Sequence, residues 1–388
     1  MPFSGVDYYA LDDLLTEDER IVRDTMRRFV DEEVLPGIGM HFRNGTFPMT
    51  LPKRLGEMGA LGASIEGYGC AGLGPVAYGL IMQELERADS GVRSFASVQG
   101  SLVMHPIATF GSEAQKQKWL PRMARGEAIG CFGLTEPDFG SNPAGMRATA
   151  KKVGDKWVIN GDKRWITSGG LADVALCWAR TPDGVRGFLV ERGTPGFSTR
   201  DIDGKFSLRA SVTSELVFED CAVGNDAMLP GAIGIKAPLE CLASARFGIS
   251  FGVIGAAMAC YDEALRYTKD RTQFGDKPLA GHQLVQLKLV DMLTEITKAQ
   301  LLILRLGRLK EQKRATVAQI SMAKRNNVKM ALTIARNARD LLGANGITDE
   351  YQCGRHMCNL ESVFTYEGTD HIHTLIIGQD ITGLAAFT

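Results

Sequence analysis

The sequence lacks the features that define several large classes of protein. Its 388 residues carry a net charge of -1 without any block of Lys and Arg, so the charge balance attracts neither nucleic acid nor an anionic membrane. It has no run of about 18 uninterrupted apolar residues, so its pattern predicts no membrane insertion. Its eight cysteines are irregularly spaced and include no CxxC pair, so we expect neither a disulfide framework nor a zinc site.

The N-terminal stretch, residues 1–7, has neither the basic nor the apolar segment of a secretory signal. We therefore expect a cytoplasmic protein with buried, reduced thiols. His371 and His373 have no Cys or carboxylate cluster near them in the sequence, so no metal is expected. With 45% hydrophobic and 23% charged residues, the composition is that of a globular protein of two or three domains.

Three regions with different periodicities follow one another. Residues 1–128 predict a helical domain, in which the capping box Thr16–Glu19 starts a helix expected to end at Pro36. Apolar residues at helical spacing predict three more helices in this domain, over residues 51–58, 76–87 and 113–125.

Residues 129–236 change to the period of strands and predict an antiparallel β-domain. Two β-type runs flank Asn160-Gly161, which predicts a hairpin turn there. Further strands are expected over residues 174–180, 185–191 and 215–223. Residues 237–388 are again helical and predict a four-helix bundle, with long helices over 238–270, 282–311 and 316–342. The predicted fold class is therefore α+β.

A glycine-rich segment, Gly67-Tyr68-Gly69-Cys70-Ala71-Gly72, matches the GxGxxG pattern of dinucleotide-binding folds. That pattern requires a strand before it and a second parallel strand beyond the following helix. The flanking segments here are mostly helical, so we interpret the segment as a turn between helices.

Two segments of the middle region carry small hydroxyls and exposed backbone donors. Residues 132–142 have the sequence FGLTEPDFGSN, and Trp165-Ile166-Thr167 follows. A flavin requires N–H and O–H donors to its ring, an aromatic or apolar wall and donors to its pyrophosphate. The first segment alone is equally typical of an ordinary turn. The second, similar segment in the same region favours a flavin site.

Three further segments allow two interpretations each. Arg271 ends one expected helix, and Gln283 begins the next. An Arg there can bind phosphate, complement the helix dipole, or do both. Residues 341–346 are typical of a helix C-cap, and a ligand role is equally compatible. Glu367, within Tyr366-Glu367-Gly368-Thr369, is either a catalytic base or a surface carboxylate in a loop.

Together these motifs resemble the acyl-CoA dehydrogenase family across essentially the whole chain. The motifs are FGLTEP at 132–137, WIT at 165–167, RTQFG at 271–275 and YEGT at 366–369, and their order and spacing are highly specific. Residues 84–94, 97–99, 339–346 and 365–367 are most similar to the glutaryl-CoA dehydrogenase subgroup. The resemblance implies a helical domain, a β-domain and a helical bundle, in that order.

The resemblance further implies FAD-dependent α,β-dehydrogenation of an acyl-CoA thioester. Glu367 would remove the α-proton, its backbone N–H and a flavin hydroxyl would hold the enolate oxygen, and the β-hydride would pass to flavin N5. A desolvated carboxylate is a better base than one in water. Some relatives place the base just before an Arg on a C-terminal helix. The matching position here is Ala245, before Arg246, which leaves Glu367 as the base.

By the same resemblance, Thr135 and Thr167 would bond the isoalloxazine, with Trp165 stacked beside it. The residues implied to bind FAD are Phe132, Leu134, Thr135, Ser141, Trp165, Ile166, Thr167, Arg271, Phe274, Gln283, Asp340, Gly343, Ala344 and Thr369. Those implied to bind substrate are Arg93, Ser94, Ser141, Ser244, Arg246 and Gly368.

Arg93 bears on the choice of substrate. A guanidinium buried in an acyl pocket is costly unless an anion meets it. In the subgroup, the matching Arg binds the distal carboxylate of glutaryl-CoA, and Glu86 and Ser94 would orient it here. Oxidation followed by loss of carbon dioxide would then give crotonyl-CoA. The alternative is a structural ion pair with Asp89 or Glu86.

The leading hypothesis is therefore a glutaryl-CoA dehydrogenase of lysine and tryptophan catabolism that passes electrons to electron-transfer flavoprotein. By resemblance it would be a homotetramer in which Arg271 and Gln283 reach a neighbour's FAD. A second hypothesis is an enzyme of the same fold without decarboxylation. It would be a short-chain acyl-CoA dehydrogenase, an acyl-CoA oxidase, or an enzyme acting on carrier-protein thioesters. A third is a flavin-binding scaffold without turnover.

Overall fold

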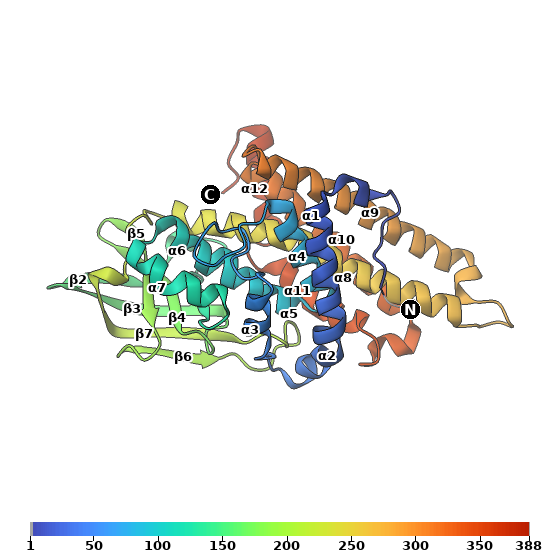
Figure 1. Ribbon diagram of the computed structural model, residues 1–388, viewed down its shortest axis with the longest axis horizontal. Coiled ribbons are helices and arrows are strands. Elements are labelled where there is room, and N and C mark those ends of the chain that lie inside the picture. The colour runs from blue at the N-terminus through green and yellow to red at the C-terminus, as the bar shows by residue number, and fades with distance from the viewer. Residues whose placement is uncertain (1–2, 388) are drawn as a thin grey trace.

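The computed structural model describes residues 3–387 as three consecutive parts (Figure 1). Helices of the N-terminal part lie between a β-sheet at one end of the molecule and a helical C-terminal part at the other. The α+β architecture predicted from the sequence is confirmed.

The N-terminal part begins as the capping box predicts. Thr16 Oγ1 accepts from the backbone N–H of Glu19, and Glu19 Oε2 accepts from that of Thr16. The expected helix end at Pro36 is wrong. A π-helical segment, η2 (Val30–Val34), leads into a second helix whose first turn contains Pro36, where its missing N–H is not needed. The helices are α1 (Glu17–Phe29), α2 (Leu35–Asn44), α3 (Leu51–Glu57), α4 (Pro75–Ala88), α5 (Ser90–Ser97), α6 (His105–Phe110) and α7 (Glu113–Ala124), with a second π-helical segment, η3 (Val98–Met104), between α5 and α6.

The glycine-rich segment of residues 67–72 lies in the connection between α3 and α4. Among the described residues, no strand precedes it, so the requirement for a dinucleotide fingerprint is not met. The interpretation as a connection between helices is confirmed.

The middle part is a seven-stranded sheet in the order β1-β4-β2-β3-β7-β6, with β5 paired to β4. Most strand pairs are antiparallel, as the sequence predicts, but β1 and β2 both run parallel to β4. A parallel pair joins strands that are distant in sequence, so local patterns do not reveal it. The strands are β1 (Gly130–Gly133), β2 (Thr149–Val153), β3 (Lys156–Thr167), β4 (Val174–Thr181), β5 (Gly184–Glu191), β6 (Phe197–Asp201) and β7 (Thr213–Gly224).

The predicted hairpin at Asn160-Gly161 is also wrong, since both residues lie within the single strand β3. The side chain of Asn160 instead bonds across to Asp220 on β7, accepting from its backbone N–H at 2.8 Å. The register shifts between Ile159 and Gly161, where a Cβ on the glycine would lie 2.7 Å from Ala148 Cα. The Asn-Gly pair therefore forms a bulge in the strand instead of a turn.

The C-terminal part is built around α8 (Lys236–Asp270), which is 35 residues long. By length and composition α8 could cross a membrane, but 83% of its most apolar window is buried within the protein, as in the core helix of a globular fold. The remaining helices are α9 (Gln283–Glu311), α10 (Val317–Leu341), α11 (Cys353–Thr365) and α12 (Asp370–Thr382). The long helices predicted from periodicity are confirmed within two residues at each end.

Helix α8 approaches α4 closely because glycines line the face between them. A Cβ at Gly252 would lie 2.1 Å from Glu86 Oε2, and one at Gly255 would lie 1.9 Å from Gln83 O. The contact at Gly255 is with backbone, so the two helices can pack at this separation only with glycine there, whereas a side chain at position 252 would have to displace the Glu86 carboxylate.

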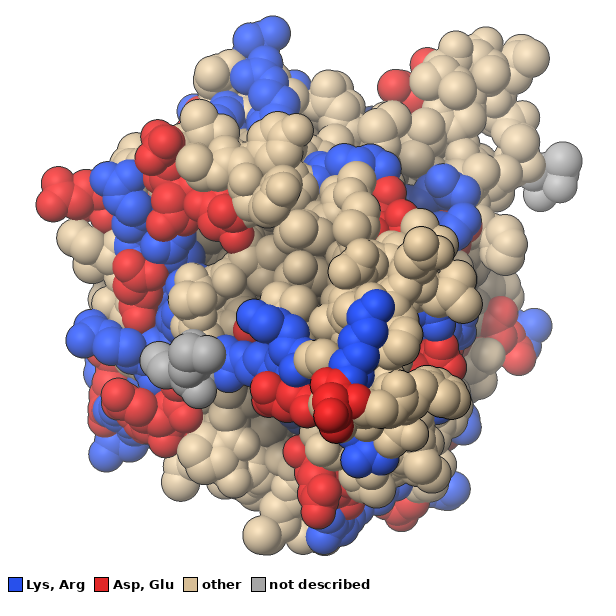
Figure 2. All heavy atoms as spheres, turned by 90° about the vertical axis from the view of Figure 1, so that its right-hand side faces the viewer, with Lys and Arg blue, Asp and Glu red and all other residues tan. Residues whose placement is uncertain are grey.

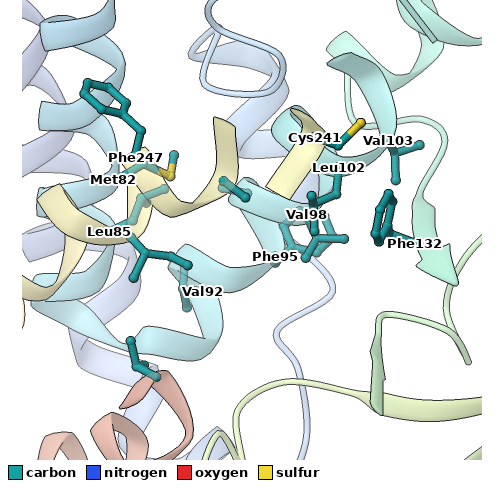
Figure 3. Packing of buried hydrophobic residues seen from close by; sticks show 14 of the residues in the cluster. Met82, Leu85, Val92, Phe95, Val98, Leu102, Val103, Phe132, Cys241 and Phe247 are labelled. Atoms are coloured by element: carbon teal, nitrogen blue, oxygen red, sulfur yellow. The ribbon is translucent and has the colours of Figure 1, made fainter. Parts of the chain in front are cut away.

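An apolar core joins the N-terminal helices to α8 and to the sheet. In Figure 3, side chains from α4, α5 and η3 meet Phe247 and Cys241 of α8, and Phe132 of β1 lies beside Val103. The labelled side chains are all at most 7% exposed, as expected for one continuous core.

Asn359 of α11 links all three parts of the fold. Its Nδ2 donates to Asp89 Oδ2, at the start of α5, over 2.8 Å. Its Oδ1 accepts from the backbone N–H of Leu208, in the loop between β6 and β7, at 2.8 Å. All these groups are buried; the amide is the partner of the Leu208 N–H, and it shares Asp89 Oδ2 with Arg355 Nη1, which lies 3.5 Å away.

We expect Asn359→Ala to lower the free energy of unfolding by roughly 2–4 kcal/mol, because it leaves the buried N–H of Leu208 unpaired and leaves only the 3.5 Å contact with Arg355 at the buried Oδ2 of Asp89. Thermal unfolding of the FAD-bound protein would measure the change. Asn44→Ala is the matched control, since Asn44 is exposed and makes no side-chain hydrogen bond among residues 3–387. Equal midpoints for the two variants would show that the junction does not contribute.

Candidate active site

The loop that carries Glu367 is the short connection between α11 and α12. Helix α11 ends at Thr365, and Thr369 caps α12 by accepting from the backbone N–H of Ile372 at 3.2 Å. Within the loop, Glu367 has φ +50° and Gly368 has φ +95°. A left-handed φ is unfavourable for a glutamate, so surrounding contacts have to hold it there.

Two buried cations hold this loop by its backbone. The ammonium of Lys324 on α10 donates to Tyr366 O at 3.0 Å and to Gly368 O at 2.8 Å. Arg246 Nε on α8 donates to the carbonyl between them, Glu367 O, at 2.7 Å. Three successive carbonyls are therefore bound by two side chains that are each at most 6% exposed.

The carboxylate of Glu367 has the environment of a base. Its Oε2 is buried and has no hydrogen-bond partner among the described residues. Burial raises the pKa of Glu367 to about 7, although the charges of Arg93, Arg246 and Lys324 act in the opposite direction. A carboxylate with this pKa is ionised near neutral pH and is a stronger base than one in water. Ala245, the alternative position for a base, is a fully buried alanine.

Arg93 lies in the same site and is 1% exposed. Its Nε donates to Glu86 Oε2 at 2.6 Å, and its Nη2 donates to the hydroxyl of Tyr366, the residue before Glu367. Of the two ion-pair partners considered from the sequence, the structure therefore has Glu86. Asp89 instead bonds Asn359. Glu86 holds the guanidinium in one orientation, as predicted.

Hydroxyls line the helices next to Arg93. Ser94 is 3% exposed, and the Oγ of Ser97 is buried without a partner among the described residues. Tyr78 on α4 bonds Ser101 Oγ at 2.9 Å, and burial raises its pKa. The charges of Arg93 and Glu367 also act on Tyr78, so its hydroxyl belongs to the same polar region.

Sequence reasoning missed Lys324 and Tyr78. Lys324 does carry a signal, because it occupies a helical face whose neighbours Ile320, Ala323 and Val328 are all buried. A lysine on such a face is seldom buried without a specific partner. Tyr78 has no such signal, since a buried tyrosine in an apolar helix is common.

The two segments predicted to bind the flavin lie side by side. The backbone N–H of Arg164 donates to Thr135 O at 2.8 Å. Trp165 follows at a β-bulge with φ +64° and is 55% exposed. The hydroxyls of Thr135 and Thr167 have no partner among residues 3–387 and are half-buried. A flavin ring requires hydrogen-bond donors and an aromatic wall. The two unpartnered hydroxyls and the exposed indole of Trp165 offer these, so the residues fit FAD.

Other predicted flavin residues can act only through their backbone. The side chains of Phe132, Leu134 and Ile166 are buried in the core, and Phe132 packs edge-on against Trp178 with 6.0 Å between ring centroids. Ser141 is exposed on the following loop.

A buried ion pair supports the first flavin segment from below. Lys163 Nζ donates to Glu136 Oε1 at 2.9 Å and to Leu134 O at 3.2 Å. Glu136 also accepts from the backbone N–H groups of Arg147 and Ala148, which fixes the turn. Neither Lys163 nor Glu136 was predicted as a site residue.

Of the remaining predicted FAD residues, Thr369 lies in the loop of Glu367, and the others lie at the far end of the helical bundle. The loop between α8 and α9 carries Arg271 and Phe274 and extends away from the sheet, at the right of Figure 1. Phe274 is 92% exposed there. Lys288, one turn beyond Gln283, pairs with Asp340 at the end of α10. The other members of this group are Gln283, Gly343 and Ala344, all exposed. One chain therefore does not bring the two groups of predicted FAD residues together.

This far end has an apolar surface. Leu284, Leu287 and Val290 on α9 are each more than half exposed, and Ile347 beyond α10 is 76% exposed. Figure 2, which views this end, shows an area with few charged side chains above the centre and a band of Lys, Arg, Asp and Glu side chains just below it.

The predicted substrate residues fall on the elements around Glu367. Arg246 and Ser244 lie on α8, with Ser244 half-buried, and Gly368 follows the base. A Cβ at Gly368 would lie 3.0 Å from His373 Nε2 and 3.3 Å from Arg246 Nη2, so no larger residue fits there without a shift. Among the described residues, no group of His, Cys, Asp and Glu side chains is arranged to hold a metal ion.

Comparisons with known proteins agree with this geometry. Models of the acyl-CoA dehydrogenase N-terminal, middle and C-terminal domains match residues 16–127, 131–221 and 233–382. The mitochondrial short-chain specific acyl-CoA dehydrogenase of Mus musculus is 35% identical over 371 residues, covering 94% of this chain and 90% of that protein. A solved glutaryl-CoA dehydrogenase from Mycobacterium smegmatis, in complex with FADH2, is 53% identical with a TM-score of 0.98, covering 99% of each chain.

A third similarity is to a chain in a structure of the electron transferring flavoprotein of Acidaminococcus fermentans. It is 32% identical, with a TM-score of 0.91, and the match covers 95% of this chain and 98% of that chain.

Fold and site together define a flavin-dependent dehydrogenase whose substrate is an acyl thioester. The chain belongs to the acyl-CoA dehydrogenase family, and the resemblance predicted from its motifs is confirmed. It is a FAD-dependent acyl-CoA dehydrogenase that is similar to glutaryl-CoA dehydrogenase.

We expect Glu367→Gln to keep bound FAD while slowing flavin reduction by an acyl-CoA about 100- to 10,000-fold, the usual contribution of a general base. Glutamine preserves the shape of the side chain but has no basic oxygen. Anaerobic stopped-flow absorbance of the bound flavin would measure the rate. A variant that reduces its flavin at the wild-type rate would show that Glu367 is not the base.

We also expect the rate of flavin reduction to depend on pH through the same carboxylate. Because burial raises the pKa of Glu367 to about 7, the basic form is present above that pH and is lost as the pH falls. The rate should drop about tenfold per pH unit on the acidic side. A rate that stays constant between pH 5 and 8 would contradict this assignment.

Proposed function

We propose that this enzyme oxidises and decarboxylates glutaryl-CoA, giving crotonyl-CoA and carbon dioxide. The observation that carries the proposal is Arg93, a buried cation whose Nη2 bonds Tyr366, directly next to the proposed base. A short apolar acyl chain cannot pair with a buried guanidinium, whereas the carboxylate at the end of the five-carbon glutaryl chain can.

The charges around the base support an anionic substrate. Arg93, Arg246 and Lys324 act on Glu367 through their charges, and Glu86 pairs with Arg93. Three cations against two carboxylates leave one net positive charge when all are ionised. The distal carboxylate of glutaryl-CoA would neutralise it, because buried charges are stable mainly when paired.

The residues of the chain suggest how each step would proceed. Glu367 takes the α-proton, and the electrons of that C–H bond become those of the enolate. The bound FAD supplies the two-electron acceptor for the β-hydrogen. Loss of carbon dioxide from the resulting glutaconyl-CoA then leaves its bonding electrons conjugated with the thioester. The protonated Glu367 carboxyl can return its proton to the γ-carbon, which gives crotonyl-CoA.

Tyr366 supports recognition of a distal carboxylate in a second way. Its hydroxyl oxygen accepts from Arg93, so its own O–H is free to donate to another acceptor. A carboxylate placed between Arg93 and Tyr366 would then receive a charge-assisted bond and a neutral one.

The alternative is a short-chain acyl-CoA dehydrogenase, supported by the 35% identity to the mouse enzyme. Under this alternative Arg93 serves only to pair with Glu86 and to orient Tyr366. The two proposals differ in what removal of the guanidinium does to each substrate.

We also propose that the enzyme is a homotetramer. The predicted FAD residues Arg271, Phe274 and Gln283 lie at the far end of the bundle, away from Thr135 and Trp165. A second copy that covered the apolar surface at this end would bring its own exposed residues to a neighbour's FAD. Loss of FAD and dissociation would then be linked.

Electron-transfer flavoprotein is the proposed electron acceptor, with docking near Trp165. The indole is exposed, and the guanidinium of Arg164 lies 5.2 Å from its centroid. A polar groove beside it is lined by Arg164, Arg200, Asp201, Ile202, Asp203 and Glu215, which offers charges of both signs to a partner.

We expect glutaryl-CoA to bleach the flavin of the purified enzyme under anaerobic conditions, with release of carbon dioxide and crotonyl-CoA. Bleaching that stops at glutaconyl-CoA would retain the dehydrogenase and remove the decarboxylation. Bleaching by butyryl-CoA alone would establish the short-chain alternative.

The matched variant is Arg93→Met combined with Glu86→Gln, because removing Arg93 alone would leave a buried carboxylate unpaired. We expect the double variant to lose roughly 100-fold in kcat/KM with glutaryl-CoA and much less with butyryl-CoA. Equal losses with both substrates would show that Arg93 does not bind the distal carboxylate.

A further inference from the structure

Lys324 is the one buried ammonium in contact with the loop of Glu367 in the described part of the chain, and the chemistry proposed above does not use it. It comes from α10, a helix that contributes none of the residues predicted to contact the substrate. Its side chain is 1% exposed, so it was brought into the core at a substantial desolvation cost.

The contacts of Lys324 fall on either side of Glu367. A single nitrogen bonds Tyr366 O at 3.0 Å and Gly368 O at 2.8 Å. Tyr366 O belongs to the peptide plane before Glu367, and Gly368 O belongs to the plane after Gly368. Because both carbonyls point to one atom, the two planes that bracket the Glu367-Gly368 pair are fixed relative to each other. Between these planes lie the two left-handed residues of the loop, Glu367 with φ +50° and Gly368 with φ +95°.

The other buried groups at the loop do not replace this contact. Arg246 binds only the carbonyl of Glu367 itself. His373 packs beside Gly368, and burial lowers its pKa to about 3, so it is neutral. Asp370 begins α12 and pairs with Arg325 at 3.2 Å.

We infer that Lys324 is a positioning residue of the dehydrogenation reaction, which holds Glu367 in the backbone conformation that directs its carboxylate at the α-carbon of the thioester. This inference rests on the proposed role of Glu367 as the base. It assigns to Lys324 no contact with substrate or FAD.

The bridge does not require a fixed protonation state. Burial lowers the pKa of Lys324 to about 7, and the neutral amine still has the two N–H donors that the two carbonyls need. A contact of this kind can therefore hold the loop over the range in which the base itself titrates.

The test compares Lys324→Met with Lys324→Gln. Methionine is unbranched, has one side-chain atom fewer than lysine and removes every donor. Glutamine keeps two N–H donors on one nitrogen, on a side chain one bond shorter. Lys329→Met is the matched control, since Lys329 lies on the same helix and is exposed. All four proteins, wild type included, are measured as FAD-bound enzyme, with rates expressed per bound flavin.

The readouts are the anaerobic rate of flavin reduction by butyryl-CoA, the affinity for crotonyl-CoA, and the deuterium isotope effect with butyryl-CoA labelled at the α-carbon. We expect Lys324→Met to reduce its flavin about 10- to 100-fold more slowly, as for a misplaced catalytic group, with crotonyl-CoA affinity within threefold of wild type. Its α-isotope effect should increase, because proton removal becomes more strongly rate-limiting. Lys324→Gln should recover part of the rate, and Lys329→Met should match wild type.

The inference is overturned if Lys324→Met reduces its flavin at the wild-type rate per bound FAD, whatever its stability. It is also overturned if the rate falls without an increase in the isotope effect, since general damage to the fold would do that. If Lys324→Met binds no FAD, the same criteria apply to Lys324→Gln. If Glu367→Gln reduces its flavin at the wild-type rate, Glu367 is not the base and the proposed function itself fails. That result is distinct from the results with Lys324 variants, which test only the positioning role.

Discussion

The site depends on the burial of charge against the backbone of one short loop. Glu367 occupies a conformation that a glutamate avoids, and three successive carbonyls are bound to cations that come from two different helices. Moving these charged groups out of water costs free energy, and their hydrogen bonds to the carbonyls offset only part of it. The arrangement is therefore stable only where α8 and α10 pack tightly on each other, which ties the geometry of the base to the integrity of the helical bundle.

The same packing explains the properties of the base. The apolar residues around the site remove water from Glu367, which raises its proton affinity, while Arg93, Arg246 and Lys324 limit that increase. Without the cations the carboxyl would stay protonated at neutral pH and could not act as a base. Without the burial it would be ionised but weakly basic.

The sequence predicted the three-part fold and the long helices because their periodicity is strong and local. It also pointed to the YEGT motif, whose Glu367 is buried with an unpartnered carboxylate oxygen; its role as the base stays a prediction. The Asn160-Gly161 hairpin failed because a side-chain bond to Asp220, distant in sequence, made that dipeptide a bulge. Lys324 escaped notice for a related reason: its carbonyl partners are more than forty residues away on another element. Local patterns indicate elements, whereas contacts between elements decide what a polar residue within one of them does.

The glycine face of α8 has a consequence for how substrate preference can change in this protein. Position 252 lies against the carboxylate that holds Arg93, so a side chain there would displace that pair as well as separate α4 from α8. Substitutions on this face of α8 therefore cannot enlarge or shrink the neighbouring space in small steps. A pocket reshaped for a longer or an uncharged acyl chain would have to be remodelled from α4 and α5, through Tyr78, Glu86, Arg93 or Ser94, while α8 stays as a fixed surface. Under the proposed role of Arg93, the choice of acyl chain and the spacing of the two helices therefore depend on the same contact.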